Sequence, residues 1–138
     1  MASHRPPFES LRDYVEALEA RGLLLRFSGV DQDAYEATGI MYALIDEFGL
    51  HEAPAVLFEN FRANGRVYPG PMVANTQGHM DTEAILFGIE PHPRDVRQSY
   101  RAAKTLLLDQ LERNAGNYTL IEPLALEAAL CDRAKKEL

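Results

Sequence analysis

Residues 55–75 have the sequence AVLFENFRANGRVYPGPMVAN, and this stretch decides the fold class. The apolar run of residues 55–59 has the length of a buried strand, and Asn64-Gly65 is a strong β-turn signal. Residues 66–68 can return as a strand, and residues 72–75 can form another. Because a short hairpin connects antiparallel strands, the sequence predicts a sheet that is at least partly antiparallel.

A helix and a strand are predicted before this stretch. Ser10, followed by Asp13 three residues on, resembles a helix N-cap. Apolar residues at helical spacing then predict a helix from about Leu11 to Arg21, and Gly22 suits its C-terminal end. Residues 23–27 follow directly and are predicted to form a short strand.

Further elements are predicted on both sides of the strands. Three helices are expected from capping residues and apolar stripes: one capped by Asp31 and ended by Gly49, a short one capped by Asp81 or Thr82 and ended by Gly88, and a long one starting at Pro93 and ending near Arg113. Residues 118–121 are strand-like, and residues 124–138 are compatible with a helix.

The order of these elements predicts an α+β (α/β) fold, in which a small mixed β-sheet packs with about four to five helices. A single domain is expected over residues 1–138, with a core of residues 8–122 and a helix-compatible tail of residues 123–138. The residues predicted to be buried in the core are Leu18, Leu44, Leu57, Phe58 and Leu107.

Composition excludes several classes of function. Of 138 residues, 14 are Lys or Arg and 21 are Asp or Glu, so the formal charge is −7. This acidic balance argues against a nucleic-acid partner, and no apolar run has the length of a membrane span. Residues 1–10 lack the apolar core of a signal peptide, and Cys131 has no second cysteine to pair with. A cytoplasmic protein is therefore expected.

The histidines allow two interpretations of one loop. His4, His51, His79 and His92 show no helical metal-binding spacing, and His51 and His92 are expected to be exposed loop residues. His79 and Asp81 follow a predicted strand, where functional loops often lie, and could form an acid/base pair. The alternative, which the sequence favours, is that Asp81 caps the next helix while His79 is solvated.

Other candidate residues carry weaker signals. Arg94, Arg97 and Arg101 are predicted to form a basic stripe on the long helix, which could dock a carboxylate, a phosphate or an acidic partner, or could simply be solvated. Cys131 is expected to be a packing residue rather than a nucleophile. The acidic pairs are expected to be solvated surface rather than a catalytic carboxylate pair: Glu16/Glu19 and Asp31/Asp33.

Three stretches together resemble the N-terminal domain of the UbiD-type decarboxylases. Residues 10–26 (SLRDYVEALEARGLLLR) resemble that family's opening helix and strand. Residues 53–60 (APAVLFEN) resemble its next strand, and residues 72–75 and then 82–88 resemble its strand with Asn followed by a short helix ending in Leu-Gly. The order and spacing of the stretches agree over about residues 8–122.

The resemblance implies a function for the complete protein. The family's enzymes use prenylated FMN and a divalent metal to decarboxylate, or reversibly carboxylate, aromatic, heteroaromatic and α,β-unsaturated acids. Their catalytic and cofactor residues lie in a later flavin-binding domain, so no catalytic, cofactor-binding or metal residue is assigned in this chain. The chain is expected to be an N-terminal piece or a separate small subunit, inactive alone and binding no flavin. Its expected partner is the flavin-binding domain or subunit.

Two alternatives remain. The chain could be a free-standing α+β interaction module, which could form a homo-oligomer, or a small enzyme that uses His79 and Asp81. If a catalytic domain normally covers this domain, apolar surface should be exposed, leading either to self-association or to a tail folded back over the sheet. The expected contributors are the loop 68–80, with Tyr68, Pro69, Pro71, Met72 and Met80, and the tail residues Leu124, Leu126 and Leu130.

Overall fold

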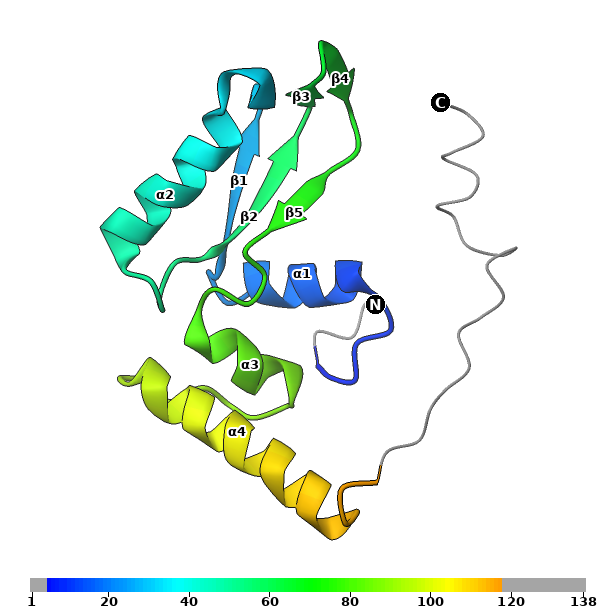
Figure 1. The fold of residues 1–138 in the computed structure, drawn as a ribbon, viewed down its shortest axis with the longest axis vertical. Helices are drawn as coiled ribbons and strands as arrows, with labels where there is room; N and C mark the ends of the chain where they lie inside the picture. Colours follow the sequence, from blue (N-terminus) through cyan, green and yellow to red (C-terminus); the bar gives the residue numbers. More distant parts are fainter. Residues whose placement is uncertain (1–4, 118–138) are drawn as a thin grey trace, which may run out of the picture. The chain divides into compact units, whose positions relative to one another are not determined.

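The computed structural model describes residues 5–117 (Figure 1). The chain divides into units of residues 1–107 and 108–138; the sheets and helices described below lie in the first, except that the last helix continues to Arg113. The described residues form four α-helices, a three-stranded sheet and a two-stranded sheet, which confirms the predicted α+β class. The predicted strand 118–121 and helical tail lie outside the described residues.

The three-stranded sheet is mixed. It consists of β1 (Leu24–Ser28), β2 (Ala55–Glu59) and β5 (Met72–Ala74), in the order β1-β2-β5. β1 and β2 are parallel, with Leu24 opposite Ala55, whereas β2 and β5 are antiparallel. The parallel pair requires a crossover connection, and the intervening helix α2 (Glu36–Phe48) provides it.

The crossover begins later than the sequence predicts. Asp31 caps a single 3₁₀ turn, η1 (Gln32–Ala34), because its carboxylate accepts the Asp33 amide at 2.9 Å. Tyr35 then adopts a left-handed conformation, with φ of 60°, and α2 (Glu36–Phe48) starts after it. The prediction that Asp31 directly caps the helix that Gly49 ends is therefore wrong. Gly49, with φ of 89°, ends α2 as predicted.

The Asn64-Gly65 turn forms as predicted, but its strands make a separate sheet. β3 (Phe61–Ala63) and β4 (Arg66–Tyr68) pair as an antiparallel hairpin. Asn64 and Gly65 have φ of 52° and 69°, as the favoured two-residue hairpin turn requires. The Asp33 carboxylate accepts both turn amides at 2.7 Å, and these bonds lower its pKa. Asp33, predicted to be merely solvated, thus connects η1 to the hairpin.

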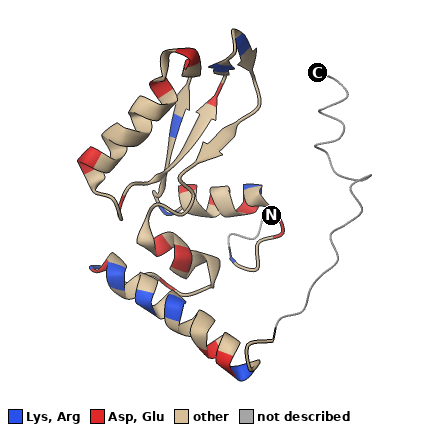
Figure 2. Ribbon diagram, in the orientation of Figure 1, with Lys and Arg blue, Asp and Glu red and all other residues tan. Residues whose placement is uncertain are grey.

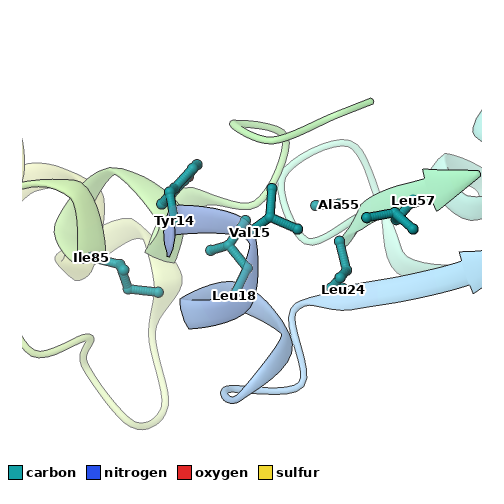
Figure 3. Packing of buried hydrophobic residues seen from close by; sticks show 7 residues of the cluster. All are labelled: Tyr14, Val15, Leu18, Leu24, Ala55, Leu57 and Ile85. Atoms are coloured by element: carbon teal, nitrogen blue, oxygen red, sulfur yellow. The ribbon is translucent and has the colours of Figure 1, made fainter. Parts of the chain in front are cut away.

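One face of the sheet packs against α1 (Leu11–Glu19), and α3 (Met80–Leu86) adds Ile85 to the same hydrophobic cluster. Ser10 caps α1 as predicted, by accepting the Asp13 amide at 3.2 Å. Figure 3 shows the α1 side chains lying between Ile85 of α3 and the side chains of β1 and β2. This cluster consists of Tyr14, Val15, Leu18, Leu24, Ala55, Leu57 and Ile85.

The opposite face packs against α2. Val56 and Phe58 alternate with Leu57 along β2, so they point to this second cluster, together with Leu44 of α2. Because both faces of β2 are covered, its residues 55–58 are all buried. The remaining members of the cluster are Val30, Ala37, Ala53 and Phe61.

Four of the five predicted core residues are buried, but Leu107 is 45% exposed. Leu107 lies on α4 (Val96–Arg113), whose buried residues are the small Ser99 and Ala103. Helical spacing identifies an apolar face, but it does not tell which part of that face another element covers. The prediction that Leu107 is core is therefore wrong for the described structure.

An ion-pair cluster lies on the α1 side of the sheet. Arg26 of β1 contacts both carboxylate oxygens of Glu19, at 2.6 and 2.7 Å, and Glu59 of β2 at 3.0 Å. The hydrogen bonds to Arg26 lower the pKa of Glu19 and those to Glu19 raise the pKa of Arg26. Glu19, predicted to be solvated surface, is exposed but paired.

Candidate functional site

The loop between β5 and α3 is held in place by Asn75. Its side-chain amide donates to the carbonyl oxygens of Ala53 at 3.0 Å and Pro54 at 2.9 Å, which lie just before β2. The Asn75 side chain also occupies the space where a Cβ atom on residue 78 would lie, so this position requires glycine. These contacts fix the path of the chain toward His79.

A second contact fixes the same loop to α1. The Tyr14 hydroxyl donates to the carbonyl oxygen of Thr76 at 2.7 Å. Tyr14 is 5% exposed, and this burial raises the pKa of its hydroxyl. The loop is therefore anchored to both α1 and the start of β2.

His79 ends the loop and caps α3. Its Nδ1 atom accepts a hydrogen bond from the Asp81 amide at 3.1 Å, while its carbonyl oxygen accepts one from the Thr82 hydroxyl at 2.6 Å. The His79 side chain is 11% exposed. The favoured prediction, a solvated His79 with Asp81 or Thr82 as the cap, is therefore wrong. A neutral imidazole nitrogen is an acceptor like an Asn or Asp oxygen, although His is not among the preferred capping residues.

Asp81 lies beside the His79 ring without a hydrogen bond to it. Its Oδ2 atom is 3.8 Å from His79 Nδ1, and its Oδ1 atom is buried with no hydrogen-bond partner among the described residues. An unpartnered buried oxygen of a carboxylate is energetically unfavourable, since it has lost its water without gaining a donor. Asp81 Oδ1 is therefore an acceptor without a donor among the described residues.

A polar cleft of about 490 Å³ lies next to this pair. Its second wall is the segment that leads into α4, which follows α3 in the chain. Figure 2 shows basic residues on the first half of α4 and acidic residues on α3. The charged and titratable lining residues are Glu52, His79, Asp81, His92, Arg94, Asp95 and Arg97.

The second wall is ordered by local hydrogen bonds. Asp95 accepts the Arg97 amide at 3.0 Å and the side-chain amide of Gln98 at 3.1 Å. Hydrogen bonding to the Gln98 side chain, then to the Arg97 amide, lowers the pKa of Asp95. Asp95 therefore accepts hydrogen bonds from the first turn of α4, which starts at Val96. The prediction that the helix starts at Pro93 is wrong by three residues.

The structure brings some candidate residues together and separates others. His79, Asp81, His92, Arg94 and Arg97 all line the cleft. Arg94 precedes α4, so the predicted stripe on one helix is incorrect at its first position.

The other candidates lie elsewhere. Arg101 is exposed on α4 and is not among the cleft-lining residues, and His51 is exposed as predicted, as is His92. His4 and Cys131 lie outside the described residues. Sequence reasoning missed Glu52 as a lining residue, and no local signal marks it. Asp95 immediately before an apolar helical stripe was a usable capping signal.

An apolar groove of about 390 Å³ is the second candidate site. It lies between α2 and the strands, with Met41 on one side and Met72 on the other. Met72 is 45% exposed although it belongs to a strand. The full lining is Gln32, Ala37, Thr38, Met41, Phe58, Phe61, Met72, Val73 and Ala74.

The predicted exposed loop is largely observed near this groove. Tyr68, Pro69, Pro71 and Met72 are exposed, whereas Met80 is partly buried at the start of α3. The predicted tail contributors lie outside the described residues. Exposed apolar side chains next to a groove are typical of a surface that binds another apolar surface.

Within residues 5–117, no group of three or more His, Cys, Asp or Glu residues is arranged to hold a metal ion. No helix in this part of the chain is both long and apolar enough to cross a membrane. Comparison with protein-family models, curated proteins and solved structures finds no match to the chain.

Proposed function

We propose that this chain is the N-terminal domain, or a separate small subunit, of a UbiD-like prenylated-FMN-dependent (de)carboxylase. In this proposal a flavin-binding domain or subunit carries the prenylated FMN, the divalent metal and the catalytic residues. The substrates are aromatic, heteroaromatic or α,β-unsaturated carboxylic acids. The present chain supports the catalytic partner and shapes one wall of its substrate cleft.

One observation carries the proposal. The three stretches that resemble the family coincide with α1–β1, with β2 and with β5–α3. These elements are neighbours in the fold, because β1, β2 and β5 form one sheet while α1 and α3 contribute side chains to the same core cluster. Similar stretches that build one continuous core support a shared domain better than scattered matches would.

The apolar groove beside β5 is the surface proposed to bind the partner. Met72, Val73 and Ala74 lie on a strand that pairs with β2 along one edge. An apolar segment of the flavin-binding partner would cover the exposed part of Met72 and fill the groove toward Met41. Burial of apolar surface is the main driving force for such an association.

Co-purification tests this proposal. The tagged chain is co-expressed with a UbiD-like flavin-binding subunit encoded near it, and the complex is captured and analysed by ultracentrifugation. Met72→Glu should abolish or strongly weaken capture by placing a charge in the groove. Leu50→Glu is the matched control, because Leu50 is 65% exposed and does not line the groove. Equal capture by both variants would refute the groove as the partner-binding surface. No capture by the wild type would refute the subunit assignment.

A free-standing interaction module is the second candidate. The observation that favours it is another exposed apolar surface, formed by Phe87 of the α3 end, Tyr100 and Leu107, which are 41%, 42% and 45% exposed. These three residues line a small pocket of about 160 Å³. A stable homodimer of the isolated chain, unaffected by Met72→Glu but dissociated by Tyr100→Glu, would support this candidate instead.

A further inference from the structure

The N-terminus of α3 is capped by a side chain that changes charge near neutral pH. Most helix caps are Ser, Thr, Asp or Asn, whose oxygens remain acceptors across the physiological range. His79 can accept the Asp81 amide only when Nδ1 carries no proton, that is, as the neutral ring with its proton on Nε2. Histidine is the side chain whose charge ordinarily changes between about pH 5 and 8.

We propose that His79 and Asp81 form a proton-operated cap at the start of α3. In the neutral state His79 Nδ1 accepts the Asp81 amide, as the structure shows. In the protonated state Nδ1–H donates to the Asp81 carboxylate, and the Asp81 amide loses its acceptor. The proposal is independent of the function proposed above.

The geometry of Asp81 provides the second state. Its Oδ2 atom lies 3.8 Å from Nδ1, too far for a hydrogen bond but close enough for a side-chain rotation to make one. Its Oδ1 atom is buried and lacks a hydrogen-bond partner among residues 5–117. A proton on Nδ1 would supply the donor that this carboxylate lacks, and the resulting bond would be charge-assisted.

Charged groups from several segments surround the pair. Glu52, Asp95, Arg94 and Arg97 line the same cleft, so carboxylates and guanidinium groups both face the pair. The other titratable groups near the pair are His92 in the cleft, Glu83 in the first turn of α3, and His51, whose carbonyl oxygen accepts the Met80 amide. The N-terminal end of a helix disfavours a cation, so the start of α3 opposes the protonated state of the pair.

The consequence of protonation is local. His79 joins the loop anchored by Asn75 to the first turn of α3, and its side chain forms part of the cleft wall. Release of the Asp81 amide would loosen the first turn of this seven-residue helix. Acidification would thereby alter one wall of the polar cleft while the sheet and α2 remain unchanged.

Nuclear magnetic resonance of the full chain tests the proposal directly. Imidazole ¹⁵N shifts report the tautomer and charge of His79, and hydrogen exchange reports protection of the Asp81 amide. We expect the Nε2–H tautomer at pH 8, and a roughly tenfold loss of Asp81 amide protection on acidification, in step with His79 protonation. Protonation of His79 that leaves the protection of this amide unchanged, or a neutral Nδ1–H tautomer at pH 8, would overturn the proposal.

Two variants separate a switch from a purely structural cap. His79→Asn retains a capping oxygen but cannot titrate, so its Asp81 amide should remain protected from pH 8 to pH 5. Asp81→Asn removes the carboxylate, so protonation of His79 should require a lower pH than in the wild type. If His79→Asn loses protection on acidification just as the wild type does, or if Asp81→Asn titrates like the wild type, the pair is not the switch. The wild-type spectra decide the question even if a variant does not fold.

Discussion

Truncation of Leu18 should produce one of the largest losses of stability in this chain. Leu18 is 0% exposed and lies in the cluster that joins α1 to β1, β2 and α3. Leu18→Ala removes three buried carbons, each contributing about 0.8 kcal/mol of transfer free energy, or about 2.4 kcal/mol together. The residual cavity raises the expected loss to about 3–4 kcal/mol, which corresponds to a fall in Tm of roughly 10–15 °C.

The same helix offers a matched control. Leu11 is 58% exposed in the first turn of α1, so Leu11→Ala makes the same chemical change without opening a cavity. Its free energy of unfolding should stay within about 0.5 kcal/mol of the wild type. Urea unfolding followed by far-ultraviolet circular dichroism measures both variants. A loss below about 1 kcal/mol for Leu18→Ala, or equal losses for the two variants, would refute the assigned face of α1.

Four further outcomes are expected. Gly78→Ala should lower the Tm measured by calorimetry, because the Asn75 side chain fills the space for a Cβ; an unchanged Tm would contradict the loop geometry. Gly39→Ala should raise the free energy of unfolding by about 0.5–1 kcal/mol, since this helical glycine has open space around it. Asp33 has a lowered pKa, so it stabilises the hairpin above about pH 4 and this contribution disappears as pH falls through its folded-state pKa. The Tm difference between wild type and Asp33→Asn should therefore vanish in acid, and a constant difference would show another cause. Finally, the chain purified from cells that make prenylated FMN should show no stoichiometric flavin band in its visible spectrum.

Elements governed by local chemistry were predictable from the sequence. Ser10 caps α1 because its hydroxyl reaches an amide three residues away, and the Asn64-Gly65 turn depends on two residues that tolerate positive φ. The buried run of β2 was also evident, since both of its faces are apolar. These signals require no knowledge of distant segments.

Features governed by tertiary contacts were not predictable. The burial of His79 depends on the loop that Asn75 anchors to the residues before β2. The cleft joins Glu52 to residues 79–97, and nothing in the local sequence indicates that approach. Leu107 shows the opposite error, because its helical spacing fits a core position while its side chain remains exposed. The sequence therefore identified several residues of the site individually but not their arrangement.

The ion-pair cluster around Arg26 makes the two outer strands of the three-stranded sheet unequal. Edge strands are templates for unwanted pairing between chains, and charged side chains are a common protection against it. If the β1 edges of two chains paired in antiparallel fashion, their Arg26 guanidinium groups, each already bonded to Glu19 and Glu59, would be brought close together. The β5 edge bears the apolar Met72 instead. Aggregation that begins from the folded chain should therefore start at β5, and a charge introduced there should improve solubility at high protein concentration more than one introduced on β1.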